Sequence, residues 1–245
     1  MQFPDNVTRL CGLKPFSFGC HPEVACFTEC CRELDLALTP YDVLRLCNEL
    51  KIKSADFIER YIVLEQDEND VFPVLYLGMV DDGSASCPFI SKKGCKVYNG
   101  RPGACRAYPV GRGVTLDENG NKRELYVLVR EDHCRGFAEE QPYTVAEWFE
   151  NQGLIEYNDI NDELLTLLQH QKVSGGMRLT GKQKDNFLLA LYKLDEFRDF
   201  LSSPDFQEEF KLNEEEIRSV LSDDLSLLRF GIRWLKETLF AEKNE

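Results

Sequence analysis

Cysteines are the residues whose type and spacing point to chemistry in this sequence. Ten occur in 245 residues, and most lie in two blocks, with a later one expected to join them. Thiolate sulfur is the donor preferred by zinc and by iron–sulfur clusters. We therefore predict soft-metal binding. The candidate ligands are Cys20, Cys26, Cys30, Cys31, Cys87, Cys95, Cys105 and Cys134.

Disulfide bonding in an exported protein is the alternative explanation for so many cysteines. The opening residues have neither a basic segment nor an apolar run, so we expect no secretory signal and a cytoplasmic location. Thiols stay reduced in that compartment. The adjacent Cys30 and Cys31 also argue against disulfides, because vicinal cysteines rarely form a relaxed bond with each other.

The spacing of the cysteines leaves the metal open. The first block reads Cys20-x5-Cys26-x3-Cys30-Cys31 and the second reads Cys87-x7-Cys95-x9-Cys105. Neither contains the C-x2-C knuckles of zinc ribbons or a ferredoxin spacing. The leading prediction is an iron–sulfur cluster of the 4Fe–4S type, with zinc as the alternative. Eight thiols would serve two four-ligand sites, or one site with spare thiols for a redox pair.

Arginines and histidines lie beside several of the cysteines and are candidates for roles at the same site. Arg101 and Arg106 flank Cys105 and are predicted to bind the cofactor, by compensating thiolate charge or holding an anionic substrate. Surface salt bridges are the alternative for both arginines. His21 and His133 adjoin cysteines, and an exposed or hydrogen-bonded imidazole is favoured over a ligand. No catalytic residue is predicted.

The remaining two cysteines are expected to lie outside the site. Cys47 falls on an apolar helical stripe, where a buried structural thiol is favoured over a ligand. Cys11 precedes both blocks. Replacement of Cys47 by serine should therefore leave the metal content intact, whereas replacement of Cys105 should lower it.

The charge of the chain restricts its partners. The net charge is −14, and residues 141–245 carry 21 Asp and Glu against 12 Lys and Arg. Phosphate backbones and anionic membrane surfaces attract clustered basic residues, so we expect neither nucleic acid nor membrane as partner. No apolar run approaches a membrane span. Solubility explains most of the acidity, and a protein substrate or partner stays open.

Regular elements are predicted around the cysteines. Residues 1–17 read as an irregular leader, and residues 18–34 as loop and short turn. Thr39 and Pro40 open one helix, and Ser54 caps a second that runs to Leu64. Residues 71–80 read as a strand. Residues 110–115 and 125–129 are predicted to form a hairpin around the turn Asn119-Gly120-Asn121, which would carry Cys134 back toward the other cysteines.

After residue 140 the composition changes, since the cysteines end and helical patterns follow. Helices are expected from Thr144, over residues 160–170, over 182–201 with a cap at Thr180, and over 213–240 with a cap at Asn213. We predict a helix-rich α+β protein. Its domains would be a loop-dominated metal–thiolate domain with a small β-hairpin at 1–140, and an acidic, mainly helical region at 141–245.

Several of these motifs together resemble a known family. They are Phe18-Gly-Cys20, Cys30-Cys31, residues 38–42, Cys87-Pro-Phe-Ile90, Cys95-Lys-Val-Tyr98, Arg101-Pro102, Cys105-Arg-Ala-Tyr-Pro109 and Cys134-Arg-Gly136. The pattern resembles the YkgJ-type cysteine-cluster family, which is described as zinc- or iron-chelating and includes flagellin lysine N-methylases. That family usually spaces its first cysteines as C-x2-C-x2-C-C, so the gaps of five and three residues here depart from it.

The resemblance implies metal chelation and, for the methylase-like members, an iron–sulfur cluster with S-adenosylmethionine as methyl donor. The sequence has no G-x-G-x-x-G after a predicted strand and no C-x3-C-x2-C triplet. Three hypotheses result. The first is an iron–sulfur protein with a redox or protein-modification role, the second is a structural zinc module for protein interaction, and the third is a protein-lysine methylase.

Overall fold

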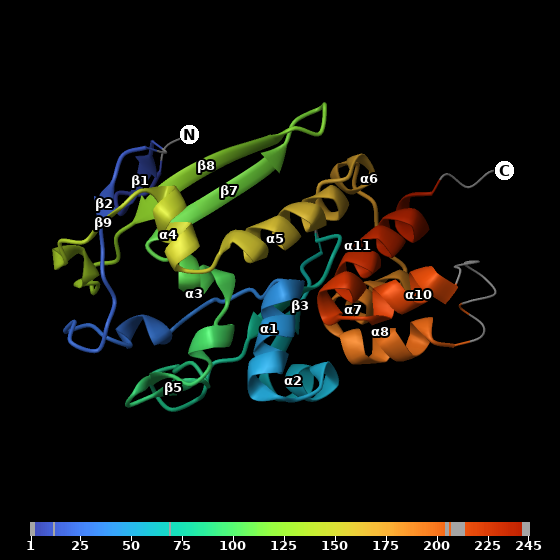
Figure 1. Ribbon diagram of the computed structural model, residues 1–245, viewed down its shortest axis with the longest axis horizontal. Coiled ribbons are helices and arrows are strands. Elements are labelled where there is room, and N and C mark those ends of the chain that lie inside the picture. The colour runs from blue at the N-terminus through green and yellow to red at the C-terminus, as the bar shows by residue number, and fades with distance from the viewer. Residues whose placement is uncertain (1–2, 12, 69, 204–205, 207–213, 242–245) are drawn as a thin grey trace. The chain divides into compact units, whose positions relative to one another are not determined.

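The structure is a computed structural model that describes residues 3–11, 13–68, 70–203, 206 and 214–241 (Figure 1). It contains 45% helix and 17% strand in small antiparallel sheets, which confirms the predicted helix-rich α+β class. In the described residues, none of the helices has both the length and the apolar character needed to span a bilayer.

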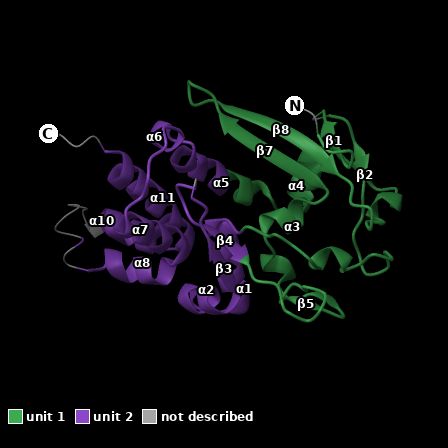
Figure 2. Cartoon of the chain, turned by 180° about the vertical axis from the view of Figure 1, so that it is seen from behind, with its two compact units in different colours: residues 1–37, 77–159 green, residues 38–76, 160–245 purple. Residues whose placement is uncertain are grey.

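The chain divides into two compact units, each made of two separate stretches of sequence (Figure 2). Unit 1 comprises residues 1–37 and 77–159, and unit 2 comprises residues 38–76 and 160–245. All of the candidate ligands fall within unit 1. The predicted domain boundary near residue 140 refers to independent folding. The two compact units do not test it, so the domains 1–140 and 141–245 stay a prediction.

The main sheet of unit 1 contains the predicted hairpin. Strands β7 (Val110–Leu116) and β8 (Lys122–Val129) pair antiparallel, with Val110 opposite Leu128. Asp117 closes the turn by accepting the N–H groups of Asn119 and Asn121 at 3.0 and 2.9 Å. The hairpin is therefore confirmed, because its turn residues supply the hydrogen bonds that the sequence indicated.

The first residues of the chain are more regular than predicted. Strand β1 (Val7–Leu10) pairs with β8, and β2 (Phe16–Ser17) pairs with β9 (Pro142–Tyr143). The expectation of an irregular leader is therefore wrong over these strands. Short strands gain order from a partner edge that lies far away in sequence, and local periodicity does not report such an edge.

An aromatic core lies at the point where β2 leads into the first cysteine block. The ring of Phe18 makes edge contacts with Tyr108, Phe137 and Trp148 at 5.6, 5.1 and 5.5 Å. Trp148 belongs to α4 (Val145–Asn151), which begins with a capping box at Thr144 as predicted. This core supports the segments on either side of Cys20 and Cys134.

The cysteine segments contain only short elements, as the sequence predicted. They are η1 (Glu29–Cys31), β5 (Ile90–Ser91), β6 (Gly94–Cys95), η2 (Tyr98–Gly100), α3 (Gly103–Ala107) and η3 (Gly136–Ala138). From residue 19 to residue 35, Val24 is the one buried side chain.

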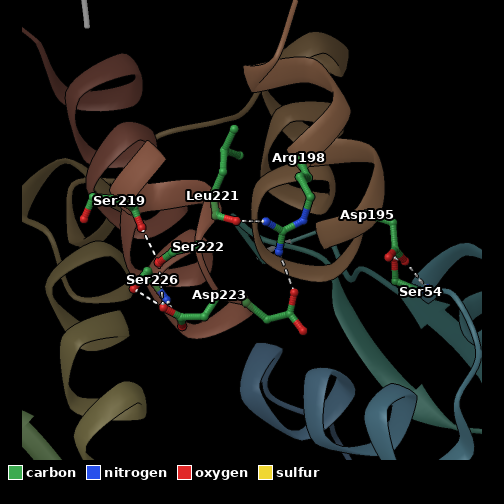
Figure 3. Close-up of polar contacts among 9 residues, drawn as sticks. Ser54, Asp195, Arg198, Ser219, Leu221, Ser222, Asp223 and Ser226 are labelled. Carbon is green, nitrogen blue, oxygen red and sulfur yellow. Dashed lines mark hydrogen bonds and ion pairs between the residues drawn. The ribbon is translucent and has the colours of Figure 1, made fainter. Parts of the chain in front are cut away.

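Unit 2 begins with α1 (Pro40–Leu50), where Thr39 and Asp42 form a reciprocal capping box. Helix α2 (Ser54–Tyr61) gives way to β3 (Ile62–Glu65), so the predicted extension to Leu64 is wrong. The predicted cap is also wrong. Lys53 occupies the cap position, while the backbone N–H and hydroxyl of Ser54 donate to Asp195 at 2.7 and 2.9 Å (Figure 3). Strand β4 (Val74–Leu77) is shorter than the predicted 71–80.

The remaining helices differ from the predicted ranges: α5 (Ile155–Leu168) begins five residues before the predicted 160–170, and the two long predicted helices are each divided. The others are α6 (Gln171–Ser174), α7 (Gly181–Tyr192), α8 (Leu194–Leu201), α10 (Glu214–Leu221) and α11 (Asp224–Phe240). The predicted helix over 182–201 breaks at Lys193, and Asp223 caps a new helix within 213–240. The predicted cap at Thr180 is confirmed, and that at Asn213 lies outside the described residues.

Candidate metal centre

The segments that carry Cys20 and Cys134 meet through their glycines. The N–H of Gly19 donates to the carbonyl of Gly136 at 3.0 Å. A Cβ atom on Gly136 would lie 2.5 Å from the Gly19 carbonyl oxygen, so this approach requires a residue without a side chain. Nearby, the N–H of Arg135 donates to the sulfur of Cys26 at 3.1 Å. The hairpin thus returns the Cys134 segment to the first block, as predicted.

The two cysteine blocks are joined directly through the backbone. The N–H of Cys87 donates to the carbonyl of Cys31 at 2.8 Å. The N–H of Glu33 donates to the carbonyl of Ala85 at 2.9 Å, and Arg32 forms a β-bridge with Ser86. These bonds place the vicinal cysteines of the first block beside the first cysteine of the second.

Cys95 is positioned by the tight hairpin of β5 and β6, in which it lies opposite Ile90. Gly94 adopts a φ of +106° in this turn, and a Cβ there would lie 3.0 Å from the Phe27 ring. Both the positive φ and the close ring favour glycine. The contact holds the hairpin against the first block.

Cys105 lies on α3, and the neighbouring Arg106 holds that short helix in place. The buried guanidinium donates to the carbonyls of Arg101 at 3.0 Å and Gln152 at 2.8 Å, and also to that of Asn99. It lies 5.1 Å from the ring centroid of Tyr157. Arg106 therefore supports the loop that carries Cys105, and its predicted role toward a cofactor stays a prediction.

Arg101 interacts electrostatically with thiols of both cysteine blocks. It donates to the carbonyl of Tyr98 at 2.9 Å and to the side-chain oxygen of Gln152 at 2.6 Å, and it lies 3.8 Å from the Tyr98 ring centroid. Desolvation lowers the Arg101 pKa, whereas negative charge on Cys105 and Cys95 raises it. The predicted roles of Arg101, compensation of thiolate charge or the holding of an anionic substrate, stay predictions.

The electrostatics of the thiols divide them into two sets. Desolvation, followed by the charges of Cys30, Cys26 and Cys134, raises the pKa of Cys20 to about 11. A hydrogen bond with Cys30, followed by burial and by the charges of Cys30, Cys87 and Cys105, raises the pKa of Cys31. Desolvation and then the charge of Cys95 raise the pKa of Cys87.

Cys30 and Cys31 form the junction between these sets. The hydrogen bond from Cys31 is the main cause that lowers the pKa of Cys30 to about 6, and His133 contributes further. The first set contains Cys20, Cys26, Cys30 and Cys134. The second contains Cys31, Cys87, Cys95 and Cys105. Spacing along the sequence does not reveal this division.

The donor chemistry of unit 1 suits a soft metal, because eight thiols from four segments influence one another. Within the described ranges, no three His, Cys, Asp or Glu side chains are placed so that together they could hold a metal ion. Cys11 is exposed, and Cys47 is buried on α1 in unit 2, as predicted. Burial, followed by the charges of Asp195 and Asp224, raises the pKa of Cys47 to about 12.

The two histidines of this region occupy surface positions. His21 lies 3.4 Å from a Glu139 oxygen and 3.9 Å from a Glu23 oxygen, contacts that become ion pairs when the imidazole is protonated. His133 is exposed. The positions that sequence reasoning missed are Gly19, Gly94, Gly136 and Phe27. A glycine beside a cysteine was the available signal for close backbone approach.

Residues 19–146 match the CxxCxxCC family, whose description is "Putative zinc- or iron-chelating domain". The match covers more than half of the chain, and the chain belongs to this family. It confirms the resemblance seen in the cysteine motifs. Neither the curated proteins nor the solved structures contain a match to the chain.

Proposed function

We propose that this protein carries electrons through iron–sulfur clusters held by two sets of four cysteines in unit 1. Two contacts support this proposal: the Cys87 N–H donates to the Cys31 carbonyl at 2.8 Å, and the Arg135 N–H beside Cys134 donates to the Cys26 sulfur at 3.1 Å. Each set offers four sulfurs, the ligand number that a 4Fe–4S cluster takes. When bound, such a cluster supplies a one-electron redox couple.

The residues around the thiols suit an anionic cluster. Four thiolates carry substantial negative charge, and nearby N–H donors and cations stabilise it. The Arg135 N–H already donates to the sulfur of Cys26, and Arg101 lies among Cys20, Cys95 and Cys105. Neither set includes a histidine, so each presents sulfur alone.

The cysteine positions also suit electron exchange with another molecule. Cys20, Cys30 and Cys105 are exposed, and the other candidate ligands are half-buried. Electron transfer requires a cofactor close to the surface, and the loops that carry these cysteines lie there. A redox role is therefore supported by the exposure of both sets.

The first test is the iron, zinc and acid-labile sulfide content of anaerobically purified protein, together with its visible spectrum. We expect about eight iron and about eight sulfide per chain, if both sets hold 4Fe–4S clusters. The spectrum should bleach with dithionite. Zinc without sulfide would overturn the proposal and favour a structural zinc module.

Variants test the division into two sets. Cys26→Ser and Cys95→Ser each remove a sulfur from a different set, so each should lose about half of the iron, because each set holds one four-iron cluster. Cys47→Ser is the matched control and should retain all of it, since Cys47 belongs to unit 2. Complete iron loss in both test variants would indicate one shared centre and overturn the two-set assignment.

A further inference from the structure

The second cysteine block lies in an unusually basic part of an acidic protein. Residues 83–116 contain six Lys and Arg and no Asp or Glu, although the whole chain carries a net charge of −14. By contrast, residues 136–171 contain eight Asp and Glu and no Lys or Arg. Positive charge is thus concentrated in the segment that carries Cys87, Cys95 and Cys105.

The arginines of this segment are engaged within unit 1. Arg106 is buried against backbone carbonyls, and Arg101 donates to Tyr98 and Gln152. Arg112 forms an ion pair with Glu124. Their charges are held by intramolecular contacts, so the lysines of the segment are the cations left for another molecule.

Three lysines surround Cys95, namely Lys92, Lys93 and Lys96, and all are exposed. None of their ammonium groups makes a hydrogen bond or an ion pair with any residue that the structure describes, although the charge of Lys96 also acts on the Cys87 thiol. Tyr98 follows them with 56% of its surface exposed. We call these four residues the lysine hairpin.

The turn that presents the lysines is well defined. The Ser91 hydroxyl donates to the Gly94 carbonyl at 2.8 Å, and the Lys93 N–H donates to the Ser91 oxygen at 3.2 Å. The positive φ of Gly94 and its contact with Phe27 fasten the same turn to the first cysteine block. A partner that meets these lysines therefore meets them beside Cys95.

We propose that the lysine hairpin docks an acidic protein next to the metal centre. The role of that partner as an electron donor or acceptor rests on the proposed function, whereas the docking rests on charge. Separate lysines hold a small anion weakly, because each is a hydrated point charge in water. Against an extended acidic surface their attractions add and steer the encounter.

The chemistry of the hairpin favours a protein over other polyanions. A net charge of −14 opposes every polyanion, and it opposes nucleic acid most, because a nucleic-acid backbone carries a longer and denser line of negative charge than the acidic surface of a protein. The exposed Tyr98 supplies an aromatic residue of the kind that is enriched where proteins meet. The Arg101 guanidinium carbon lies 3.8 Å from the centroid of the Tyr98 ring, and this contact holds the ring in place before a partner binds.

The test uses the full-length protein with Lys92, Lys93 and Lys96 all replaced by glutamate. The control replaces Lys14, Lys182 and Lys184 by glutamate, which reverses the same number of charges away from the hairpin. The binding probe is a fluorescein-labelled poly-glutamate peptide, followed by fluorescence anisotropy over a range of salt. The functional probe is reduced flavodoxin, an acidic electron carrier, mixed with oxidised protein by stopped flow.

We expect the hairpin variant to bind the peptide about tenfold more weakly at low salt and to lose most of the salt dependence, while the control changes little. Electron transfer from flavodoxin should slow by a similar factor. Iron content should be unchanged in both variants. If iron is absent from the wild type but the hairpin variant still loses peptide binding, the docking surface stands and the redox function fails.

Three results would overturn the docking proposal. The first is equal weakening in the control, which would show that overall charge, and no particular surface, governs binding. The second is tighter binding of a DNA oligonucleotide than of the peptide. The third is salt-dependent dimerisation in sedimentation, abolished in the hairpin variant, which would make the acidic residues of a second copy the partner.

Discussion

Residues 19–35 of unit 1 and helix α1 of unit 2 are neighbours in sequence, but they differ in how much apolar surface they bury. Residues 19–35 of unit 1 bury one side chain, that of Val24. Helix α1, which begins a few residues later in unit 2, buries seven of its eleven residues. A segment that buries so little apolar surface needs another source of order, and the metal–sulfur bonds that we propose would supply it.

The polar contacts also differ between the two units: side chains link packed helices in unit 2, whereas backbone hydrogen bonds link the cysteine segments in unit 1. In unit 2, Arg198 of α8 donates to the Leu221 carbonyl and to Asp224, both at 2.6 Å, and so links helices that also share an apolar core (Figure 3). In the cysteine segments of unit 1, backbone hydrogen bonds such as Cys87 to Cys31 set the path of the chain. We therefore expect helical packing alone to stabilise unit 2, whereas the cysteine loops of unit 1 should need the proposed metal.

Removal of the metal should produce the largest difference between the two units. With a chelator under anaerobic reducing conditions, backbone amides of residues 19–35 should exchange at nearly the rate of an unfolded chain, because the thiols are no longer held together. Amides of α7 and α11 should keep their protection. Hydrogen exchange read by mass spectrometry measures both regions in one sample. Equal loss of protection in α11 would contradict the contrast.

Phe57→Ala should produce the opposite pattern. Phe57 is fully buried in α2, with 0% of its surface exposed. Its truncation leaves a cavity, so we expect unfolding of unit 2 to become easier by about 3–5 kcal/mol. Denaturant unfolding followed by circular dichroism measures the change. The iron content of the folded variant should equal that of the wild type. Loss of iron in the absence of denaturant would show that the stability of one unit depends on the other.

Gly136→Ala should affect the centre through backbone geometry alone. The new methyl group would meet the Gly19 carbonyl and the Phe18 ring, which separates the segments that carry Cys20 and Cys134. Overpacking of this kind costs about 1–3 kcal/mol. We expect metal content to fall in this variant. Gly181→Ala, at a position with open space, is the matched control and should retain it.

Thr144→Ala should have the smallest effect, because it removes one helix cap in unit 1. We expect a loss of about 1 kcal/mol at neutral pH in denaturant unfolding, with unchanged iron. The Thr144 backbone N–H, followed by the Thr144 hydroxyl, lowers the pKa of Glu147 by hydrogen bonding. The variant loses only the hydroxyl, whose contribution is present above the ordinary pKa of the carboxyl group and is lost as pH falls through the lowered value. The gap between wild type and variant should therefore narrow in acid. A gap that widens there would contradict the capping role.

Local signals in the sequence were enough for several features. Thr39 with Pro40 predicted the start of α1 and Thr144 predicted that of α4, because capping depends on residues within one turn. The turn around Gly120 predicted the hairpin. The type and number of the cysteines predicted soft-metal chelation, which the family match supports at the level of zinc or iron. The burial of Cys47 followed from its apolar stripe.

Features that depend on distant partners were decided by the tertiary structure. Strand β1 is ordered by the edge of β8, and Ser54 bonds to Asp195 instead of capping its own helix. Arg106, which sequence reasoning placed beside a cofactor, donates to three carbonyls of the surrounding loops. Sequence spacing likewise does not show that Cys30 and Cys31 face different neighbours. Residue types determine which chemistry is available, but the approach of separate segments determines which atoms meet.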